Sequence, residues 1–336
     1  MQWDVFCRVV DNFGDIGVCW RLAADLASRG ELVRLWVDDP SALAWMAPTG
    51  APNLAVRPWD EASLDVTPGD VVIEAFGCEL PARFVERMAH VRPVWINLEY
   101  LSAESYVERS HRLPSPQFSE PGRGLTKHFF YPGFTPATGG LIREPGLMQA
   151  RQLFNREVWL HEHGIDLREG ERLVSLFSYD NPAQANMLRA LGSTPTLLLL
   201  TPGVAAPRAL PANMRSQRLP YLTQVNYDRL LWSCDLNFVR GEDSFVRAQW
   251  AGQPFVWQIY PQADQAHAAK LAAFLDKLPA LPGLRELWRG WNGLGAMPEQ
   301  LPPLPAWQSL CEAWRDKLVG QVDLTTQLMG FVTESR

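Results

Sequence analysis

Two hydrophobic patterns alternate along this chain. Short runs of apolar and β-branched residues, typical of buried strands, are separated by stretches whose apolar residues recur every three or four positions, typical of amphipathic helices. The first helical stretch begins near Ile16, continues through Leu26 and ends at Gly30. Strands that alternate with helices predict parallel, doubly wound sheets. We expect strands at residues 3–10, 32–37, 70–76 and 91–98, and again at 173–177, 196–200, 235–239 and 255–260.

Two segments depart from this alternation. Prolines and glycines interrupt the chain between Arg112 and Gly140, which we interpret as a long loop, ordered by the aromatic run from His128 to Tyr131. After the proline-rich residues 302–305, residues 307–329 predict a C-terminal helix or helix pair. A chain of 336 residues exceeds the size of one core. We therefore expect domains at 1–155 and 156–305, with a helical segment at 306–336 that could pack back on the first domain.

Composition and charge exclude several classes of protein. The chain is 47% hydrophobic and 20% charged, which is typical of a folded protein rather than a disordered one. A net charge of −6 argues against a nucleic-acid partner. We find no signal peptide and no apolar run of ~18 residues, so we expect a cytoplasmic protein without membrane partners. The five cysteines are widely spaced and lack a C-x-x-C motif, which predicts buried free thiols.

The strongest local motif is DNFGDIG, where the first expected strand passes into the first helix. In open α/β sheets, ligands bind at this edge of the sheet. Asp11 and Asp15 place two carboxylates there, and both are candidate catalytic groups. Alternatively, Asp15 only caps the helix and Asp11 is a turn residue. The remaining candidate residues of this loop are Asn12, Phe13 and two glycines that permit a tight turn, Gly14 and Gly17.

A second charged motif, RGEDS, follows the expected strand at 235–239 and precedes a helix that starts near Ser244. Backbone N–H groups at a helix N-terminus bind phosphate oxygens, and Arg240 adds a fork of donors suited to a diphosphate. Glu242, Asp243 and Ser244 could instead only cap this helix. For the whole string the binding interpretation is favoured, because adjacent charges at a strand end are costly unless a polar site uses them.

Aromatic and amide side chains follow other expected strands of the second half. Tyr260 could hydrogen-bond a phosphate or a sugar, although a half-buried packing role explains it as well. The other segments each offer a ring to stack on a base and a polar group to read its edge. These candidates are Phe177, Tyr179, Tyr221 and Gln224.

Several common motifs are missing. There is no G-x-G-x-x-G, which argues against a nicotinamide-dependent oxidoreductase, and no G-x-S-x-G, which leaves an esterase triad without a nucleophile. No Asp-x-Asp occurs, so the usual short motif for a metal-held nucleotide sugar is missing. His161 and His163 lie two residues apart, a spacing that diverges on a helix, and no further ligand is evident. We expect no metal and no other cofactor.

The chain resembles the enzymes that attach rhamnose to an arginine of bacterial translation elongation factor P. The resemblance rests on DNFGDIG, on FVRGEDSFVRAQWAGQPFVWQIYPQ, and on further strings such as VWINLEYLSAESYVE and KHFFYPGFTPATGGLIRE, nearly from end to end. It implies a GT-B glycosyltransferase fold, with two Rossmann-like domains facing a cleft. The donor would be dTDP-β-L-rhamnose, held by the C-terminal domain, and the acceptor would be held by the N-terminal domain. Transfer would invert the anomeric carbon without a metal and activate the factor for ribosomes stalled at polyproline.

The resemblance also implies roles for the candidate residues. Asp15 would be the base that accepts the guanidinium proton, Asp11 would support it, and Glu242 would align the guanidinium or the sugar. The family has a phenylalanine where this chain has Tyr221, and either ring can stack on a base. Two alternatives remain: a GT-B enzyme that uses another nucleotide sugar or acceptor, and a non-catalytic protein that binds elongation factor P. The implied donor pocket consists of Phe177, Tyr179, Tyr221, Gln224, Arg240, Asp243, Ser244 and Tyr260.

Overall fold

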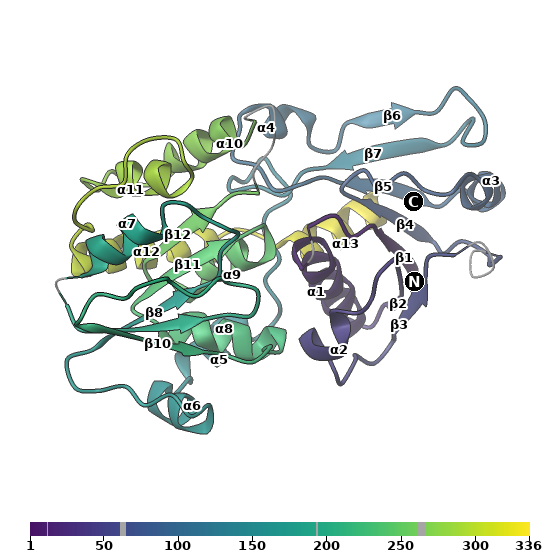
Figure 1. The fold of residues 1–336 in the computed structure, drawn as a ribbon. Helices are drawn as coiled ribbons and strands as arrows, with labels where there is room; N and C mark the ends of the chain where they lie inside the picture. The colour runs from purple at the N-terminus through teal and green to yellow at the C-terminus, as the bar shows by residue number, and fades with distance from the viewer. Residues whose placement is uncertain (12, 61–64, 193, 261–265) are drawn as a thin grey trace. The chain divides into compact units, whose positions relative to one another are not determined.

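The computed structural model describes residues 1–336 except 12, 61–64, 193 and 261–265. The chain forms two compact units (Figure 1). The first unit combines Met1–Pro145 with Gln321–Arg336, and the second unit is Gly146–Gly320. The predicted boundaries at 155 and 305 both fall inside the second unit, so the chain divides earlier, and then returns to the first unit later, than the sequence suggested.

Contacts at both ends of the second unit explain these boundaries. Near its beginning, Arg151 donates from Nε to the carbonyl oxygen of Ala251 at 3.3 Å. Near its end, Trp314 donates from Nε1 to Oε1 of Gln249 at 2.8 Å. The two acceptors, the backbone of Ala251 and the side chain of Gln249, both belong to the helix Asp243–Ala251, which is part of the second unit.

The first unit is built on a seven-stranded sheet of order β3-β2-β1-β4-β5-β7-β6. All neighbours in it are parallel except β6 and β7, which form an antiparallel pair. The order 3-2-1-4-5 is that of a Rossmann sheet, with its switch point between β1 and β4. The strands are β1 Gln2–Cys7, β2 Leu32–Val37, β3 Leu54–Pro58, β4 Val71–Ala75, β5 Val94–Leu98, β6 Pro114–Pro116 and β7 Thr126–Phe130; the helices are α1 Gly14–Ser28, α2 Leu43–Met46, α3 Ala82–Val91, α4 Tyr106–Ser110 and α13 Leu324–Glu334.

Alternation along the central strand supplies a core on each face of this sheet. Val5 of β1 packs in a cluster with α1 and α13, whereas its neighbour Phe6 packs on the other face with α3. Successive side chains of a strand point to opposite faces, and a parallel sheet buries both of them. Phe6 stacks on Trp36 with ring centroids 5.6 Å apart. Burial on both faces fixes the strand register and thus the position of the loop that follows β1.

One expectation for the first unit was wrong. Residues 112–140 are not a single long loop, because Thr126–Phe130 form strand β7, paired with β5 on one side and with β6 on the other. The aromatic run belongs to this strand, and Phe130 is fully buried. Aromatic residues favour strands, and here that preference outweighs the proline and glycine content of the flanking residues.

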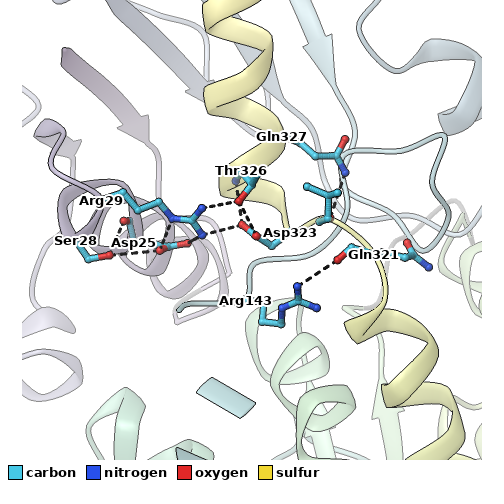
Figure 2. A network of polar contacts seen from close by, with 9 residues as sticks. Asp25, Ser28, Arg29, Arg143, Gln321, Asp323, Thr326 and Gln327 are labelled. Carbon is cyan, nitrogen blue, oxygen red and sulfur yellow. Dashed lines mark hydrogen bonds and ion pairs between the residues drawn. The ribbon is translucent and has the colours of Figure 1, made fainter. Parts of the chain in front are cut away.

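The C-terminal helix α13 is part of the first unit, and a polar network fastens its start (Figure 2). Arg29, just past the end of α1, donates to Asp25 at 2.9 Å, to Asp323 at 2.8 Å and to Thr326 at 2.6 Å. Farther along α13, apolar side chains such as Leu328 join the α1 core. The residue pair Gly320–Gln321 therefore marks where the predicted C-terminal segment leaves one unit and enters the other.

The second unit contains a five-stranded, fully parallel sheet of order β10-β9-β8-β11-β12. Its topology repeats the Rossmann order, with the switch point between β8 and β11. Leu173, Leu197 and Leu199 pack with α6 and α8, while Phe238 packs against Trp291 of α11. The strands are β8 Arg172–Leu176, β9 Thr196–Leu200, β10 Met214–Arg218, β11 Leu236–Arg240 and β12 Phe255–Gln258; the helices are α5 Leu147–Gln152, α6 Arg156–Glu162, α7 Gln184–Leu191, α8 Gln224–Ser233, α9 Asp243–Ala251, α10 Ala266–Leu275, α11 Leu284–Trp291 and α12 Leu304–Val319.

Candidate active site

Asp15 lies at the carboxyl edge of the first unit's sheet, in the first turn of α1. Its Oδ2 atom accepts hydrogen bonds from the backbone N–H groups of Val10 and Asp11, both at 2.8 Å. The predicted alternative of a helix cap therefore differs from the observed contacts: the side chain reaches back to the preceding loop, not to the N–H groups of the helix. Its Oδ1 atom faces the hydroxyl of Tyr100, at 3.5 Å.

The environment of Asp15 changes its acidity. The residue is only 3% exposed, and this burial raises the pKa of its carboxyl above the ordinary 3.8. The two backbone N–H groups oppose the rise in pKa, whereas the nearby charge of Asp11 adds to it. A carboxylate that is buried and has a raised pKa is better matched to accepting a proton at neutral pH than an exposed one.

The loop before α1 brings Asp11 next to Gly14. Asp11 accepts a backbone hydrogen bond from Gly14 at 2.7 Å, and a Cβ atom placed on Gly14 would lie 2.6 Å from Oδ2 of Asp11. Any larger residue at position 14 would therefore require this carboxylate to shift. Gly17 was also predicted to permit the tight turn, but it lies past the turn, inside α1. Phe13 packs edge-on against Trp45 at 5.2 Å, and Asn12 lies outside the described residues.

Two aromatic residues that the motifs did not single out lie beside Asp15. Phe76 follows β4, Tyr100 follows β5, and their rings stack with centroids 4.3 Å apart and planes 14° from parallel. Parallel neighbouring strands bring their carboxyl ends to one edge, which explains why residues so far apart in sequence meet there. The sequence signal for them was weak: each is a single aromatic after an expected strand.

In the second unit, five of the predicted donor residues are in direct contact. The guanidinium of Arg240, at the end of β11, lies 4.6 Å from the ring centroid of Phe177 and 4.3 Å from that of Tyr179. Tyr260, after β12, meets Tyr179 edge-on at 5.5 Å. The backbone N–H of Tyr179 donates to Oε1 of Gln258 at 2.9 Å, which fixes this turn. The cluster surrounds the switch point between β8 and β11.

Ser244 is the fifth member of this cluster, and it acts on the backbone of Arg240. Its hydroxyl accepts from the N–H of Arg240 at 3.1 Å and donates to the carbonyl oxygen of the same residue. Ser244 is buried, so its contacts hold Arg240 at the strand end. Glu242 is the N-cap residue of α9 and Asp243 is its first residue, which confirms the predicted helix start.

The remaining predicted donor residues lie farther along the same sheet edge. Tyr221 is 52% exposed between β10 and α8, and Gln224 is the buried first residue of α8. Tyr227 of α8, which the sequence did not single out, packs edge-on against Phe177 at 5.8 Å. Burial raises the pKa of the Tyr227 hydroxyl far above its ordinary range, so it stays protonated.

The cysteines, the possible metal ligands and the helices have further properties that bear on function. All five cysteines are buried free thiols, as predicted. Within the residues that the structure describes, no group of three or more histidine, cysteine, aspartate or glutamate side chains could hold a metal ion. Over the same residues, every helix is too short or too polar to cross a membrane.

Comparison with known proteins decides the family. A sequence model of the family described as elongation factor P (EF-P) rhamnosyltransferase EarP matches residues 3–333. The chain belongs to this family. It is 44% identical to the protein-arginine rhamnosyltransferase of Pseudomonas aeruginosa, with 99% of each chain covered. Membership confirms the predicted enzyme class, a glycosyltransferase.

Solved structures support the same assignment of fold. A structure concerned with EarP-mediated arginine glycosylation of translation elongation factor EF-P is 34% identical, with a TM-score of 0.69 over 100% of this chain and 99% of that one. The spinosyn forosaminyltransferase SpnP is 13% identical, with a TM-score of 0.54 over 98% and 99%, and shows the fold alone. With the two parallel-sheet units, these likenesses confirm the predicted GT-B fold class.

Proposed function

We propose that this enzyme transfers L-rhamnose from dTDP-β-L-rhamnose to an arginine of translation elongation factor P, inverting the anomeric carbon. The observation that carries the proposal is the carboxylate of Asp15, with one oxygen fixed by backbone N–H groups and the other facing Tyr100. Family membership supports the sugar and the acceptor. The modified factor would then act on ribosomes stalled at polyproline. We propose a cytoplasmic enzyme without nucleic-acid or membrane partners.

The chemistry requires a base because the acceptor is a poor nucleophile. A guanidinium stays protonated at neutral pH, so its nitrogen has no free electron pair until a proton leaves. In the proposed step, that nitrogen attacks the anomeric carbon from the side opposite dTDP, and the carbon–oxygen bond to dTDP breaks. The proton of the attacking nitrogen passes to Asp15. Asp11 would support the loop of the base, and Glu242 would align the guanidinium or the sugar.

The leaving dTDP gains negative charge as the bond breaks. Arg240 and the hydroxyl of Tyr260 would stabilise this charge, together with the backbone N–H groups at the start of α9. Ser244 would contribute by orienting Arg240, since its hydroxyl binds both backbone groups of that residue. The rest of the proposed donor pocket, which recognises the base and the sugar, consists of Phe177, Tyr179, Tyr221, Gln224 and Asp243. No step of this scheme uses a metal.

The decisive experiment is the intact mass of purified elongation factor P after incubation with the enzyme and dTDP-β-L-rhamnose. We expect a gain of one deoxyhexose on one arginine, located by peptide fragmentation. The matched control is Asp15→Asn, which should leave the mass unchanged over the same time. Parallel incubations with other nucleotide sugars test the alternative donor. An unmodified acceptor with every donor would refute the proposal.

A further inference from the structure

An arginine and an aspartate form an ion pair in the interior of the second unit. Arg247 of α9 is 2% exposed and Asp228 of α8 is 5% exposed. The guanidinium donates from Nε to Oδ1 of the carboxylate at 2.8 Å and from Nη2 to Oδ2 at 2.6 Å. Stability alone does not account for such a pair, because taking two charges out of water is costly. Apolar residues of similar volume in the same place often give an equal or greater free energy of unfolding.

The geometry of this ion pair restricts how α8 lies against α9. The two helices pack together, and the pair joins them through two parallel hydrogen bonds. A planar guanidinium that binds both oxygens of one carboxylate permits little sliding or rotation. Apolar side chains in the same place would keep the helices in contact but would fix their register less uniquely.

The ion pair lies one helical turn from predicted donor residues on both helices. Gln224 is the first residue of α8, four residues before Asp228, and Asp243 is the first residue of α9, four residues before Arg247. Residues four apart share one face of a helix and lie about 5.4 Å apart along its axis, or one turn. Gln224 comes from a segment predicted to read the base, and Asp243 comes from the RGEDS motif predicted to bind the diphosphate. The pair therefore links the two parts of the predicted donor pocket.

We propose that Arg247 and Asp228 are positioning residues, which hold the starts of α8 and α9 at the spacing that one dTDP molecule needs to reach both. The inference rests on the proposed function, in which the start of α8 receives the base and the start of α9 receives the diphosphate. Two linked groups gain affinity from their linkage only where both can bind at once. A shift of α8 along α9 would leave each half of the ligand a place to bind, but one molecule could no longer occupy both.

The test replaces the pair by apolar residues and compares dTDP with its two halves. In the double variant Arg247→Met with Asp228→Leu, the affinity for dTDP should fall about tenfold or more in titration calorimetry. Thymidine and inorganic pyrophosphate each occupy one end of the pocket, so their affinities in ligand-detected NMR titrations should stay within about twofold of wild type. The melting temperature should stay close to that of the wild type, because neither charge is left buried without its partner.

The matched control is a second bidentate pair of the same unit, between Arg215 and Glu171. Its two hydrogen bonds measure 2.7 Å and 2.6 Å. Glu171 immediately precedes β8 and Arg215 is the second residue of β10, so this pair lies at the amino edge of the sheet, away from the helix starts. Arg215→Met with Glu171→Leu should keep the affinity for dTDP within about twofold of wild type, because sites that share no partner act independently.

Arg247→Lys provides the test if the double variant does not fold. Lysine keeps the positive charge, but its ammonium is a point charge that does not fix the orientation of a carboxylate. The affinity of this variant for dTDP should fall about threefold or more, while the affinities for thymidine and pyrophosphate stay at their wild-type values.

The other outcomes contradict the proposal in different ways. Wild-type affinity for dTDP in a folded variant without the pair would overturn it. An equal loss of affinity for dTDP and for its two halves would also overturn it, because such a loss marks general damage to the pocket rather than a changed spacing. An equal loss in the control variant would overturn it as well. If the wild-type enzyme fails to bind dTDP, the proposed function fails; if it binds dTDP and the Arg247 variants match it, only this inference fails.

Discussion

Replacing Asp15 by asparagine should separate its chemical role from its structural one. The asparagine carbonyl oxygen can accept the same two bonds from Val10 and Asp11, so the loop should keep its shape. Asparagine cannot accept the guanidinium proton. We expect kcat to fall by ~10²-fold or more, the scale of a lost general base, while the affinity for dTDP is unchanged.

The same substitution should affect stability with a defined dependence on pH. Burial raises the pKa of Asp15 above 3.8 in the folded protein, so the folded state holds this proton more tightly than the unfolded chain. The contribution of Asp15 to stability therefore decreases as pH rises from 3.8 through the raised pKa. Asparagine lacks this titration. The melting temperature of Asp15→Asn relative to wild type should therefore rise as the pH increases from 3.8 through the raised pKa.

Calorimetric melting across that pH range and single-turnover kinetics provide the measurements. In the wild-type enzyme, kcat should fall on the acid side as Asp15 becomes protonated, and this limb should lie above pH 3.8. Asp15→Ala supplies the contrast. It loses both hydrogen bonds to the backbone and should lower the free energy of unfolding by about 2–3 kcal/mol, at ~1–1.5 kcal/mol for each bond. Normal turnover by Asp15→Asn, at a wild-type melting temperature, would refute the reasoning and leave Asp11 and Glu242 as candidates for the base.

Four further predictions test the rest of the site and the fold. Arg240→Ala should weaken dTDP binding at least about tenfold and Tyr260→Phe by several fold in titration calorimetry, because each removes a donor to the diphosphate; unchanged affinity in both would contradict the assignment. Rhamnose transfer should survive EDTA, and loss of activity with rescue by magnesium or manganese would refute metal independence. Gly14→Ala should lower kcat about tenfold or more at constant dTDP affinity, because its Cβ displaces the Asp11 carboxylate; wild-type kcat would show that this carboxylate can move without consequence. Arg29→Ala should lower the free energy of unfolding by about 2–3 kcal/mol, because the buried carboxylate of Asp25 loses its ion pair, and it should speed hydrogen exchange in α13. Unchanged exchange would show that apolar packing alone holds that helix.

The strands that the sequence predicted well are those buried on both faces. The apolar runs at 32–37 and 196–200 match β2 and β9 residue for residue. Two of the strands that the sequence missed, β3 and β10, lie at sheet edges. β10 has the sequence MRSQR, and only Met214 of it is buried. An edge strand is held by backbone pairing on one side, and such pairing leaves no apolar pattern in the sequence.

The sequence predicted which residues lie at the site better than it predicted the contacts that these residues make. The rule that ligands bind at the carboxyl ends of parallel strands identified Asp15, Arg240 and Ser244 as candidates. It could not show that Asp15 binds the loop before it, or that Ser244 binds the backbone of Arg240. Such contacts depend on how each loop folds back over a few residues. The motifs could not show the stack of Phe76 on Tyr100 for another reason, since it joins residues that follow two different strands.

The two units share one kind of side chain-to-backbone contact, but the side chain is charged in the first unit and neutral in the second. In each, a short polar side chain in the first turn of the helix after a central strand binds nearby backbone: Asp15 binds the loop that follows β1, and Ser244 binds Arg240 at the end of β11. A neutral hydroxyl in this place adds no negative charge beside the guanidinium of Arg240, which suits the anionic leaving group of the proposed transfer. A carboxylate in this place brings its own negative charge and an oxygen that the backbone does not use, which suits a cationic acceptor. Asp15→Ser would remove a negative charge from the first unit, and Ser244→Asp would add one beside Arg240, so in the proposed scheme the charge at this position matches the ligand of each unit.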